Sequence, residues 1–362
     1  MRVNSFTDNR VGGAVVGEMI AARLCGFAGM TLVRSVSSER FAPHWVFATE
    51  AAATSAAGCI GIVGHLDTVF PPETFETFRE DGPFLRGPGV LDMKGGLVVA
   101  MEALRALSEE GVLGRIPVRF VVVSDEEVGS PEGRLVIEEA LLGARAALVL
   151  EGGRPKDAVI TARKGTGSAV VVAEGRAAHA GNAHASGANA IWALCRFVEL
   201  AQTLTDYERG VTVNVGTIKG GTSKNTVPER AEAVLDFRFV HAADGEALLA
   251  ALEQAAVQAA LPGTKIVFRG AIGRLPLERT DKNVALYRAY ADCAAASGLG
   301  DGESALVGGG SDASTTAAMG IASIDGLGPR GLGFHTHDER IERDSIVPKT
   351  EAMMRFLLRE RV

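Results

Sequence analysis

Residues 117–130, PVRFVVVSDEEVGS, run from an apolar, β-branched stretch directly into three successive carboxylates. The apolar part, residues 117–123, is typical of a buried parallel strand. Three like charges side by side are costly unless a cation or a shifted pKa relieves them. A solvated acidic turn is the usual explanation of such a run, but this run ends an apolar strand instead of lying in a polar loop. We therefore predict that Glu127 binds a metal ion and that Glu126 accepts a proton beside it.

Two further apolar stretches have the same form, and each is followed by side chains that can bind a metal ion. Residues 59–64 (CIGIVG) lead into His65 and, two positions later, Asp67. Residues 147–150 (ALVL) lead into Glu151. The carboxyl ends of parallel strands meet at one edge of a sheet, so these side chains are predicted to meet in one crevice. Asp67 would hold the second ring nitrogen of His65 and fix its tautomer; a core histidine with a capping aspartate is the alternative.

Two more signals complete the set. In residues 87–96 (GPGVLDMKGG), glycines surround Asp92 directly before a predicted helix. A carboxylate there can bridge two metal ions about 3.5–4 Å apart, and it can also cap the helix. The segment GLGFHTHDE holds His335 and His337, and spacing alone does not decide which one binds a metal. We interpret all five signals as ends of predicted strands that converge on a site for two divalent ions with a further carboxylate beside it.

Composition narrows the classes of protein to which the chain can belong. A length of 362 residues favours two domains. Hydrophobic residues at 47% and charged residues at 22% are values of a globular protein. The net charge of −7 and the lack of a basic run argue against nucleic acid as a partner. No apolar stretch reaches the roughly 18 residues that span a bilayer, so no membrane partner is expected.

The N-terminal sequence and the cysteines narrow the location and the metal ligands. The first ten residues, MRVNSFTDNR, lack the apolar region of a secretory signal, which predicts a cytoplasmic protein. Cys25, Cys59, Cys195 and Cys293 are widely scattered and form no C-x-x-C pair. Reduced thiols are therefore expected, and any metal must be held by His, Asp and Glu.

The order of the predicted elements indicates an α/β domain with a second domain inserted into it. Between the first two strands, leucines and a methionine recur at helical spacing until Gly111. The inserted part is predicted as strand 168–174, helix 188–204, strand 211–218, strand 231–240, helix 245–260 and strand 265–269. This β-α-β-β-α-β order is ferredoxin-like. A helix at 284–297, strands at 304–307 and 321–325, and a last helix at 349–361 follow. The predicted domains are residues 1–164 with 272–362, and residues 165–271.

Polar groups near the ends of elements in the second domain are weaker signals. His179, Asn225 and Arg238 lie in GRAAHAGN, GGTSKNTVPE and LDFRF, where surface hydrogen bonding is the simpler explanation of each. The glycine-rich residues 308–314 (GGGSDAS) precede a short predicted helix and could present backbone N–H groups to an anion. They are not a nucleotide-binding loop, because neither G-x-x-x-x-G-K-[ST] nor G-x-G-x-x-G after a first strand is present.

Taken in order, these motifs resemble those of the zinc-dependent exopeptidase and deacylase family. GHLDTV, GPGVLDMKGG, SDEEVGS, LEGG, GRAAHAG, GGTSKNTVP, GGGSDA and GFHTHDE carry the resemblance from about residue 5 to 348. The family includes glutamate carboxypeptidase, acetylornithine deacetylase, succinyl-diaminopimelate desuccinylase and aminoacylase, and the glutamate carboxypeptidase branch is the most similar. The resemblance implies a phosphorylase/hydrolase-like, three-layer α/β/α catalytic domain of the zinc-exopeptidase type. It also implies an inserted ferredoxin-like α+β lid and dimerisation domain.

The resemblance also assigns roles in a site for two zinc ions, which cobalt or manganese could replace. It implies that His65 and Glu151 bind one zinc and that Glu127 and His335 bind the other, with Asp92 bridging the two. Glu126 corresponds to the general base and Asp67 to the residue that orients the histidine.

Further roles come from the lid domain of relatives. The histidine matched by His179 reaches the active site of the partner subunit in a homodimer and stabilises the oxyanion. Arg238 and Asn225 match positions that hold the substrate, and Gly309, Gly310 and Ser311 are expected to join them. Relatives carry a helix and a strand before the segment matched by VNSFTDNRVGG, whereas this sequence starts almost at it. Part of the catalytic domain is therefore expected to be more exposed.

The function that follows is hydrolysis of an amide or peptide bond next to a free carboxylate, as in a glutamate carboxypeptidase, with a small peptide as substrate. The alternative is an N-acyl-amino-acid deacylase, such as an acetylornithine deacetylase or a succinyl-diaminopimelate desuccinylase. A catalytically inactive relative that binds peptides is a third possibility, and the presence of Glu126 and every candidate ligand argues against it.

Overall fold

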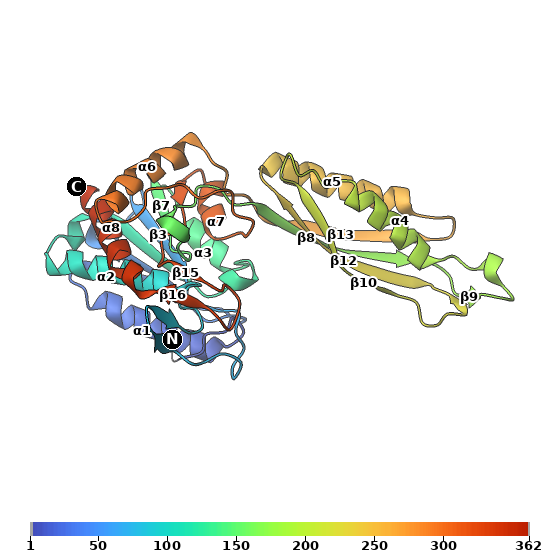
Figure 1. The fold of residues 1–362 in the computed structure, drawn as a ribbon, viewed down its shortest axis with the longest axis horizontal. Coiled ribbons are helices and arrows are strands. Elements are labelled where there is room, and N and C mark those ends of the chain that lie inside the picture. The colour runs from blue at the N-terminus through green and yellow to red at the C-terminus, as the bar shows by residue number, and fades with distance from the viewer. Residues whose placement is uncertain (1–2, 361–362) are drawn as a thin grey trace. The chain divides into compact units, whose positions relative to one another are not determined.

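The computed structural model describes residues 3–360, which form two compact units (Figure 1). The first unit comprises the described residues up to Ala162, Arg279–Val307, and those from Ser311 onward. The second unit comprises Arg163–Glu278 and Gly308–Gly310, so its main part is inserted into the first. The boundary predicted at residue 271 lies inside a strand that continues to Arg274.

The first unit contains most of the helices. Its helices and strands are α1 (Arg10–Cys25), β1 (Met30–Val36), β2 (His44–Thr49), β3 (Ile60–His65), β4 (Arg79–Asp81), β5 (Phe84–Arg86), α2 (Lys94–Glu109), β6 (Val118–Val123), α3 (Gly133–Ala140), β7 (Ala146–Val149), α6 (Asp281–Ala295), α7 (Ala313–Ala318), β14 (Ala322–Ile324), β15 (Gly331–Leu332), β16 (Arg340–Glu342) and α8 (Ile346–Arg359).

The main sheet of the first unit has the strand order β1-β2-β6-β3-β7-β14. Strands β6, β3, β7 and β14 are parallel to one another, whereas β1 and β2 add an antiparallel edge. The predicted apolar strands at 59–64, 117–123 and 147–150 are β3, β6 and β7, and they lie next to one another. Strands buried on both faces read as continuous apolar runs, which is why these three could be found from sequence.

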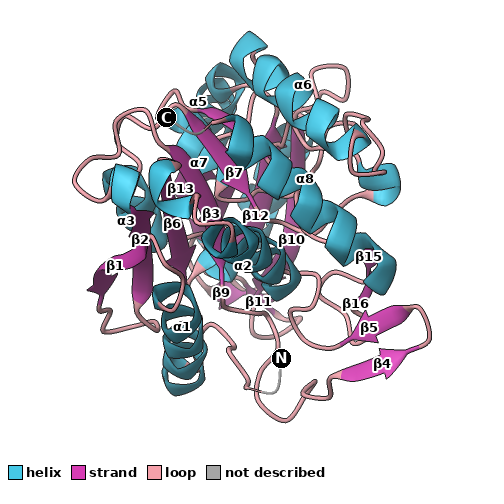
Figure 2. Ribbon diagram, turned by 90° about the vertical axis from the view of Figure 1, so that its left-hand side faces the viewer, coloured by secondary structure: helices cyan, strands magenta, loops and turns pink. Residues whose placement is uncertain are grey.

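Helices cover both faces of this sheet. Neighbouring residues of a strand point to opposite faces, and so do residues three apart. A side chain at Gly61 of β3 would meet Leu141, which follows α3, whereas one at Gly64 would meet Leu97 of α2. Helices α2, α6 and α8 pack side by side on the face of Gly64 (Figure 2), and α3 and α7 pack together against β6, β7 and β14. The first unit therefore has the predicted three-layer α/β/α architecture.

A smaller antiparallel sheet with the order β15-β16-β5-β4 adjoins the segment before α2. The connection between β15 and β16 carries His335, which has a positive φ of 58°. The prediction that His335 and Asp92 follow strands of the main sheet is therefore wrong. Asp92 directly precedes Met93 and helix α2, and His335 lies in a hairpin connection outside the main sheet.

The second unit has the predicted β-α-β-β-α-β order. Its main elements are β8 (Gly165–Glu174), α4 (Ala190–Gln202), β10 (Thr212–Gly220), β12 (Arg230–Phe239), α5 (Ala242–Ala259) and β13 (Lys265–Arg274). The antiparallel strand order is β10-β12-β8-β13. Two short strands, β9 (Ala178–His179) and β11 (Thr226–Val227), pair separately. Both helices pack on the sheet around a core that includes Phe197, Phe237 and Phe239.

Two other expectations need adjustment. Residues 304–307 form no strand, because only the backbone N–H groups of Ser304 and Val307 reach the neighbouring segment, at the carbonyls of Val159 and Ala162. The last helix, predicted for 349–361, begins earlier and ends at Arg359; position 361 lies outside the described residues. No helix within residues 3–360 combines the length and the apolar character that crossing a bilayer requires.

Candidate metal centre

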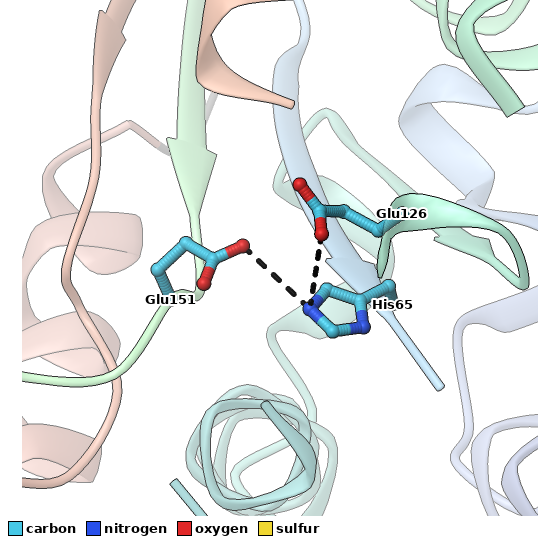
Figure 3. Close-up of side chains that lie close together, drawn as sticks. All are labelled: His65, Glu126 and Glu151. Carbon is cyan, nitrogen blue, oxygen red and sulfur yellow. Dashed lines mark ion pairs between the residues drawn. The ribbon is translucent and has the colours of Figure 1, made fainter. Parts of the chain in front are cut away.

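Three of the predicted site residues meet at the carboxyl edge of the main sheet. His65 is the last residue of β3, which lies between β6 and β7. Glu126 begins the turn after β6, and Glu151 follows β7. Their side chains converge: His65 Nε2 lies 3.9 Å from Glu126 Oε2 and 3.7 Å from Glu151 Oε1 (Figure 3). Adjacent parallel strands thus bring together side chains that are far apart in sequence.

Asp92 lies between two imidazoles. Its Oδ1 is 3.3 Å from His65 Nε2, and its Oδ2 is 3.2 Å from His335 Nε2. Glu127 Oε2 lies 3.3 Å from the same His335 nitrogen. Each oxygen of Asp92 therefore faces a different histidine, which is the arrangement that a carboxylate bridging two ions requires.

In the structure, His335 and His337 have different surroundings. The ring of His337 packs against Phe75 and Phe70, with centroids 5.5 and 6.2 Å apart. His335 points to Asp92 and Glu127 instead. Spacing in the sequence could not distinguish the two histidines, whereas the position of Phe70 and Phe75 does.

Asp67 holds both the histidine and the acidic turn. Its Oδ1 lies 3.3 Å from His65 Nδ1. Its two oxygens also accept hydrogen bonds from the backbone N–H groups of Glu126 and Glu127, each at 3.2 Å. The hydroxyl of Thr7 donates a further bond of 2.9 Å. These contacts place the Asp67 carboxylate at the second ring nitrogen of His65 and also fix the backbone that carries Glu126, which the sequence did not reveal.

The first acid of the run, Asp125, has a structural role. Asp125 is fully buried, and its Oδ2 accepts the backbone N–H groups of Glu132 and Gly133 at 2.8 and 3.0 Å. These are N–H groups at the start of α3, where a carboxylate satisfies donors that have no partner within the helix. The three successive acids therefore point in three directions, which relieves part of their mutual repulsion.

The residues of the cluster shift one another's pKa values. Burial opposes the protonation of His65, but hydrogen bonds to Asp67 and Asp92 keep its pKa well above the usual range. Hydrogen bonds to Asp92 and Glu127 raise the pKa of His335 to about 10. Burial and the nearby carboxylates of Asp92 and Glu126 raise the pKa of Glu151. Because metal binding requires neutral imidazoles and ionised carboxylates, protons and cations compete for these atoms.

The donor set fits divalent cations. Two groups of side chains place one ligand atom each within 4.8 Å of one another; they are His65, Glu126 and Glu151, and His65, Asp92 and Glu127. Within residues 3–360, the buried Oε1 atom of Glu127 has no hydrogen-bond partner. Unpaired buried polar atoms are costly, and imidazole nitrogen with carboxylate oxygen is a ligand set typical of zinc.

His179 and Asn225 lie next to each other in the second unit. His179 pairs with Thr226 in the short β9–β11 ladder, and the backbone carbonyl of Asn225 accepts the N–H of Ala180. The Nδ1 atom of His179 accepts two backbone N–H groups at 3.1 Å. Its ring proton therefore lies on Nε2, and the exposed ring can donate that proton in a hydrogen bond.

Arg238 has a second arginine close to it. Asp236 holds the Arg238 guanidinium with two bonds of 2.8 Å. On β8, Thr166 is the register partner of Arg238 on β12 and of Arg274 on β13. Residues directly opposite each other across a ladder point to the same face, so the two arginines flank Thr166 on one face of this sheet. Sequence reasoning missed Arg274, because only the strand register places it there.

The glycine-rich segment divides between the two units. Gly309 belongs to the second unit, where its carbonyl accepts a bond of 3.1 Å from Arg163, and a side chain at Gly310 would touch Arg274. Ser311 belongs to the first unit, and its buried hydroxyl donates to Asp325 at 2.6 Å. The expectation of a substrate-binding Ser311 therefore has a structural alternative, since this hydroxyl is already engaged in the core.

Two buried charged residues near the cluster were also missed. Glu339 is fully buried, and burial raises its pKa to about 7 against the opposing effect of three backbone N–H groups. Lys94 is buried too, and burial lowers its pKa to about 8 although Glu339 and Asp67 lie near. Both residues lie inside motifs that were singled out, GPGVLDMKGG and GFHTHDE. The available signal was a charged side chain two positions after Asp92 and another four positions after His335.

Comparisons with known proteins show the family and the fold of the chain. A model of Peptidase family M20/M25/M40 matches residues 61–359. Carboxypeptidase G2 of Pseudomonas sp. (strain RS-16) is 28% identical over 355 residues, which cover 95% of this chain and 77% of the relative. Acetylornithine deacetylase of Myxococcus xanthus is 32% identical over 200 residues, about half of each chain. The aminopeptidase PepT of Bacillus cereus has a similar fold, with a TM-score of 0.80, 21% identity and coverage of 98% and 94%.

The family match and the similarity to carboxypeptidase G2 and acetylornithine deacetylase identify a hydrolase of peptide or amide bonds. The chain belongs to Peptidase family M20/M25/M40, whose members are metal-dependent. The resemblance seen in the motifs is thereby confirmed.

Proposed function

We propose that the protein is a two-zinc carboxypeptidase that cleaves an amide bond next to a free carboxylate. The observation that carries the proposal is the position of Asp92, with one oxygen at His65 and the other at His335. The proposed ligands are His65 and Glu151 for one ion, Glu127 and His335 for the other, and Asp92 for both. The similarity to carboxypeptidase G2 over most of the chain favours this substrate class.

The proposed chemistry assigns one proton acceptor. When bound, the two zinc ions would polarise the scissile carbonyl and lower the pKa of an attacking water from 15.7 towards about 7. Glu126 then accepts the proton of that water and passes it to the leaving nitrogen. Asp67 assists by holding the backbone N–H of Glu126, so the base keeps its position while its side chain gains and loses a proton.

The substrate carboxylate is proposed to bind in the second unit. Arg238 and Arg274 supply two positive charges on one face of the sheet, and charge-assisted bonds from guanidinium to carboxylate are among the stronger hydrogen bonds in proteins. Asp236 fixes the orientation of Arg238 through Nε and Nη2, and Nη1 donates to the carbonyl of Gly308 at 3.4 Å. Asn225 is proposed to hold the substrate carbonyl.

We further propose a homodimer in which His179 acts on the partner's substrate. The support is the donor-ready Nε2 of an exposed His179 and the exposed apolar side chains of α4 and edge strand β10, Trp192 at 62% and Ile218 at 54%. Mixing inactive Glu126→Gln and His179→Ala proteins, after dissociation and reassembly, should restore up to about a quarter of wild-type activity, because half of the dimers are mixed and each has one complete site. Mixtures that stay inactive, or a monomer in sedimentation, contradict this arrangement.

An N-acyl-amino-acid deacylase remains the second candidate, favoured by the similarity to acetylornithine deacetylase over half of the chain. The two functions differ in which side of the amide bears the recognised carboxylate. An inactive relative is the least favoured, because a side chain in the position of Glu126 has no evident use in a protein that only binds peptides.

A substrate screen tests the proposed function. Acyl-glutamates and folate-like amides, N-acetyl and N-succinyl amino acids, and dipeptides would be assayed with zinc, cobalt and manganese supplied separately. Each substrate would be paired with its carboxamide as the matched control. We expect acyl-glutamates to be hydrolysed fastest, with at least about a tenfold loss when the carboxylate is amidated. Preference for N-acetyl or N-succinyl amino acids would favour the deacylase, and equal rates for acid and amide would contradict the arginine site.

A further inference from the structure

Glu339 is a buried acid whose carboxylate accepts hydrogen bonds from the backbone near Asp92. Its Oε1 accepts the N–H groups of Leu91 and Asp92 at 2.8 and 3.0 Å, and its Oε2 accepts the N–H of Gly89 at 3.1 Å. The side chain is completely shielded from solvent. One carboxylate therefore binds both ends of the short turn that presents Asp92.

The same residue closes the loop that presents His335. The backbone N–H of Glu339 donates to the carbonyl of Thr336 at 3.1 Å, and the N–H of Thr336 donates to the carbonyl of Gly333 at 3.0 Å. The carbonyl of Glu339 accepts the N–H of Gly87 at 3.3 Å. Backbone and side chain together tie the His335 loop to the Asp92 turn, two segments that lie about 250 residues apart in the sequence.

A carboxylate suits this place, because three backbone N–H groups point at one side chain. Burying a carboxylate is costly, and only bonds from several donors offset that cost. The hydrogen-bond donors to the Glu339 carboxylate are the backbone N–H groups of Asp92 and its neighbours, and the buried Lys94 lies near as a positive charge. The side chain thus links the two segments whose side chains, Asp92 and His335, face each other at 3.2 Å.

We propose that Glu339 is a positioning residue for the ion held by His335, Glu127 and Asp92. This inference rests on the proposed two-metal site and adds a residue that does not itself touch the ion. It sets the separation of the Asp92 oxygen and the His335 nitrogen, so its loss weakens binding at that position. The position formed by His65 and Glu151 is anchored by β3 and β7 and depends less on Glu339.

Glu339→Gln is the variant of choice, because it keeps the size of the side chain. The amide retains one acceptor oxygen, but its NH2 group replaces the second oxygen and faces a backbone N–H as donor to donor. Partners that orient metal ligands change metal affinity by about 10–100-fold when they are removed. We expect the dissociation constant of the ion at the His335 position to rise by at least about tenfold, with less than about a threefold change for the other ion.

The test is a titration of metal-free wild-type and variant proteins with Co²⁺, followed by visible absorption and by equilibrium dialysis. Asp338→Asn is the matched control, since Asp338 is the neighbouring residue and its carboxylate is exposed. The double variant Glu339→Gln with His335→Ala shows which ion is affected. If both substitutions act on the ion at the His335 position, the double variant should bind metal no more weakly than His335→Ala alone. If Glu339→Gln does not fold, as judged by circular dichroism, Glu339→Asp takes its place with the same expected loss.

The outcomes separate this inference from the proposed function. Wild-type protein that binds no divalent ion overturns the two-metal site itself. Wild-type protein that binds two ions, with both dissociation constants unchanged in Glu339→Gln, overturns only the role of Glu339. Equal weakening of both ions also overturns it, because a general loss of stability would act on both positions alike.

Discussion

Replacing Glu126 with glutamine is expected to lower turnover by at least roughly a hundredfold while both metal ions stay bound. Glutamine has the shape of glutamate and keeps the backbone N–H that Asp67 accepts, so the turn after β6 should not move. It has no basic oxygen, and proton transfer from water to the leaving nitrogen is lost. The measurements are kcat on the best substrate of the screen and metal content by elemental analysis.

Glu110→Gln is the control for Glu126→Gln, because Glu110 is an exposed glutamate at the end of α2. It should retain wild-type activity. Near-normal turnover in the Glu126 variant would remove this residue from its proposed role. Loss of one metal ion together with activity would instead make Glu126 a ligand, a reading that its place in the cluster with His65 and Glu151 also permits.

Asp92→Asn is expected to abolish activity through loss of metal, whereas Glu126→Gln should keep both ions. An amide offers one oxygen where the carboxylate offers two, and its NH2 group would face His65 or His335. Removal of a shared ligand should cost more than the 10–100-fold in affinity that an orienting partner costs, so we expect both dissociation constants to rise by more than about a hundredfold. Dialysis against a metal buffer measures this directly.

Asp301→Asn, at an exposed position, is the control for Asp92→Asn and should bind two ions as the wild type does. Saturating metal should restore part of the activity of Asp92→Asn but none of that of Glu126→Gln. An Asp92→Asn protein with two tightly bound ions would contradict the bridging role and, with it, the proposed assignment of ligands.

The parts of the fold that could be predicted are those where burial dictates the residue type. Strands β3, β6 and β7 are buried on both faces, so their sequences are apolar throughout and end abruptly at polar side chains. The same abrupt ends located His65, Glu126, Glu127 and Glu151. Because the three strands are adjacent, His65 Nε2 lies 3.9 Å from Glu126 and 3.7 Å from Glu151.

Helix α1 was not predicted, and its packing explains why. It contains glycines at positions 12, 13 and 17, which lower helix propensity. A side chain at Gly13 would collide with Ala42, and one at Gly17 would collide with Trp45, so the glycines allow close approach to the sheet. Tertiary contact outweighs local preference here, and a single sequence does not reveal it.

Hairpin geometry limited the prediction of Asp92 and His335. Strands β15 and β16 contain only two and three residues, too few for a periodic pattern. His335 could therefore be named from the motif but not placed. Arg274 is the converse case, since its sequence GAIGR shows nothing unusual and only the pairing of β13 with β8 brings it level with Arg238.

The turn after β6 sets a strict rule for tolerated changes in this protein. Asp125 caps a helix, Glu126 is the proposed base and Glu127 a proposed ligand, although all three are the same kind of acid. Inserting or deleting one residue between Val123 and Val128 would leave acids in the run, but each acid would move to the position of its neighbour and lose its own contacts. Variation in the length of this turn should therefore be as damaging as loss of an acid.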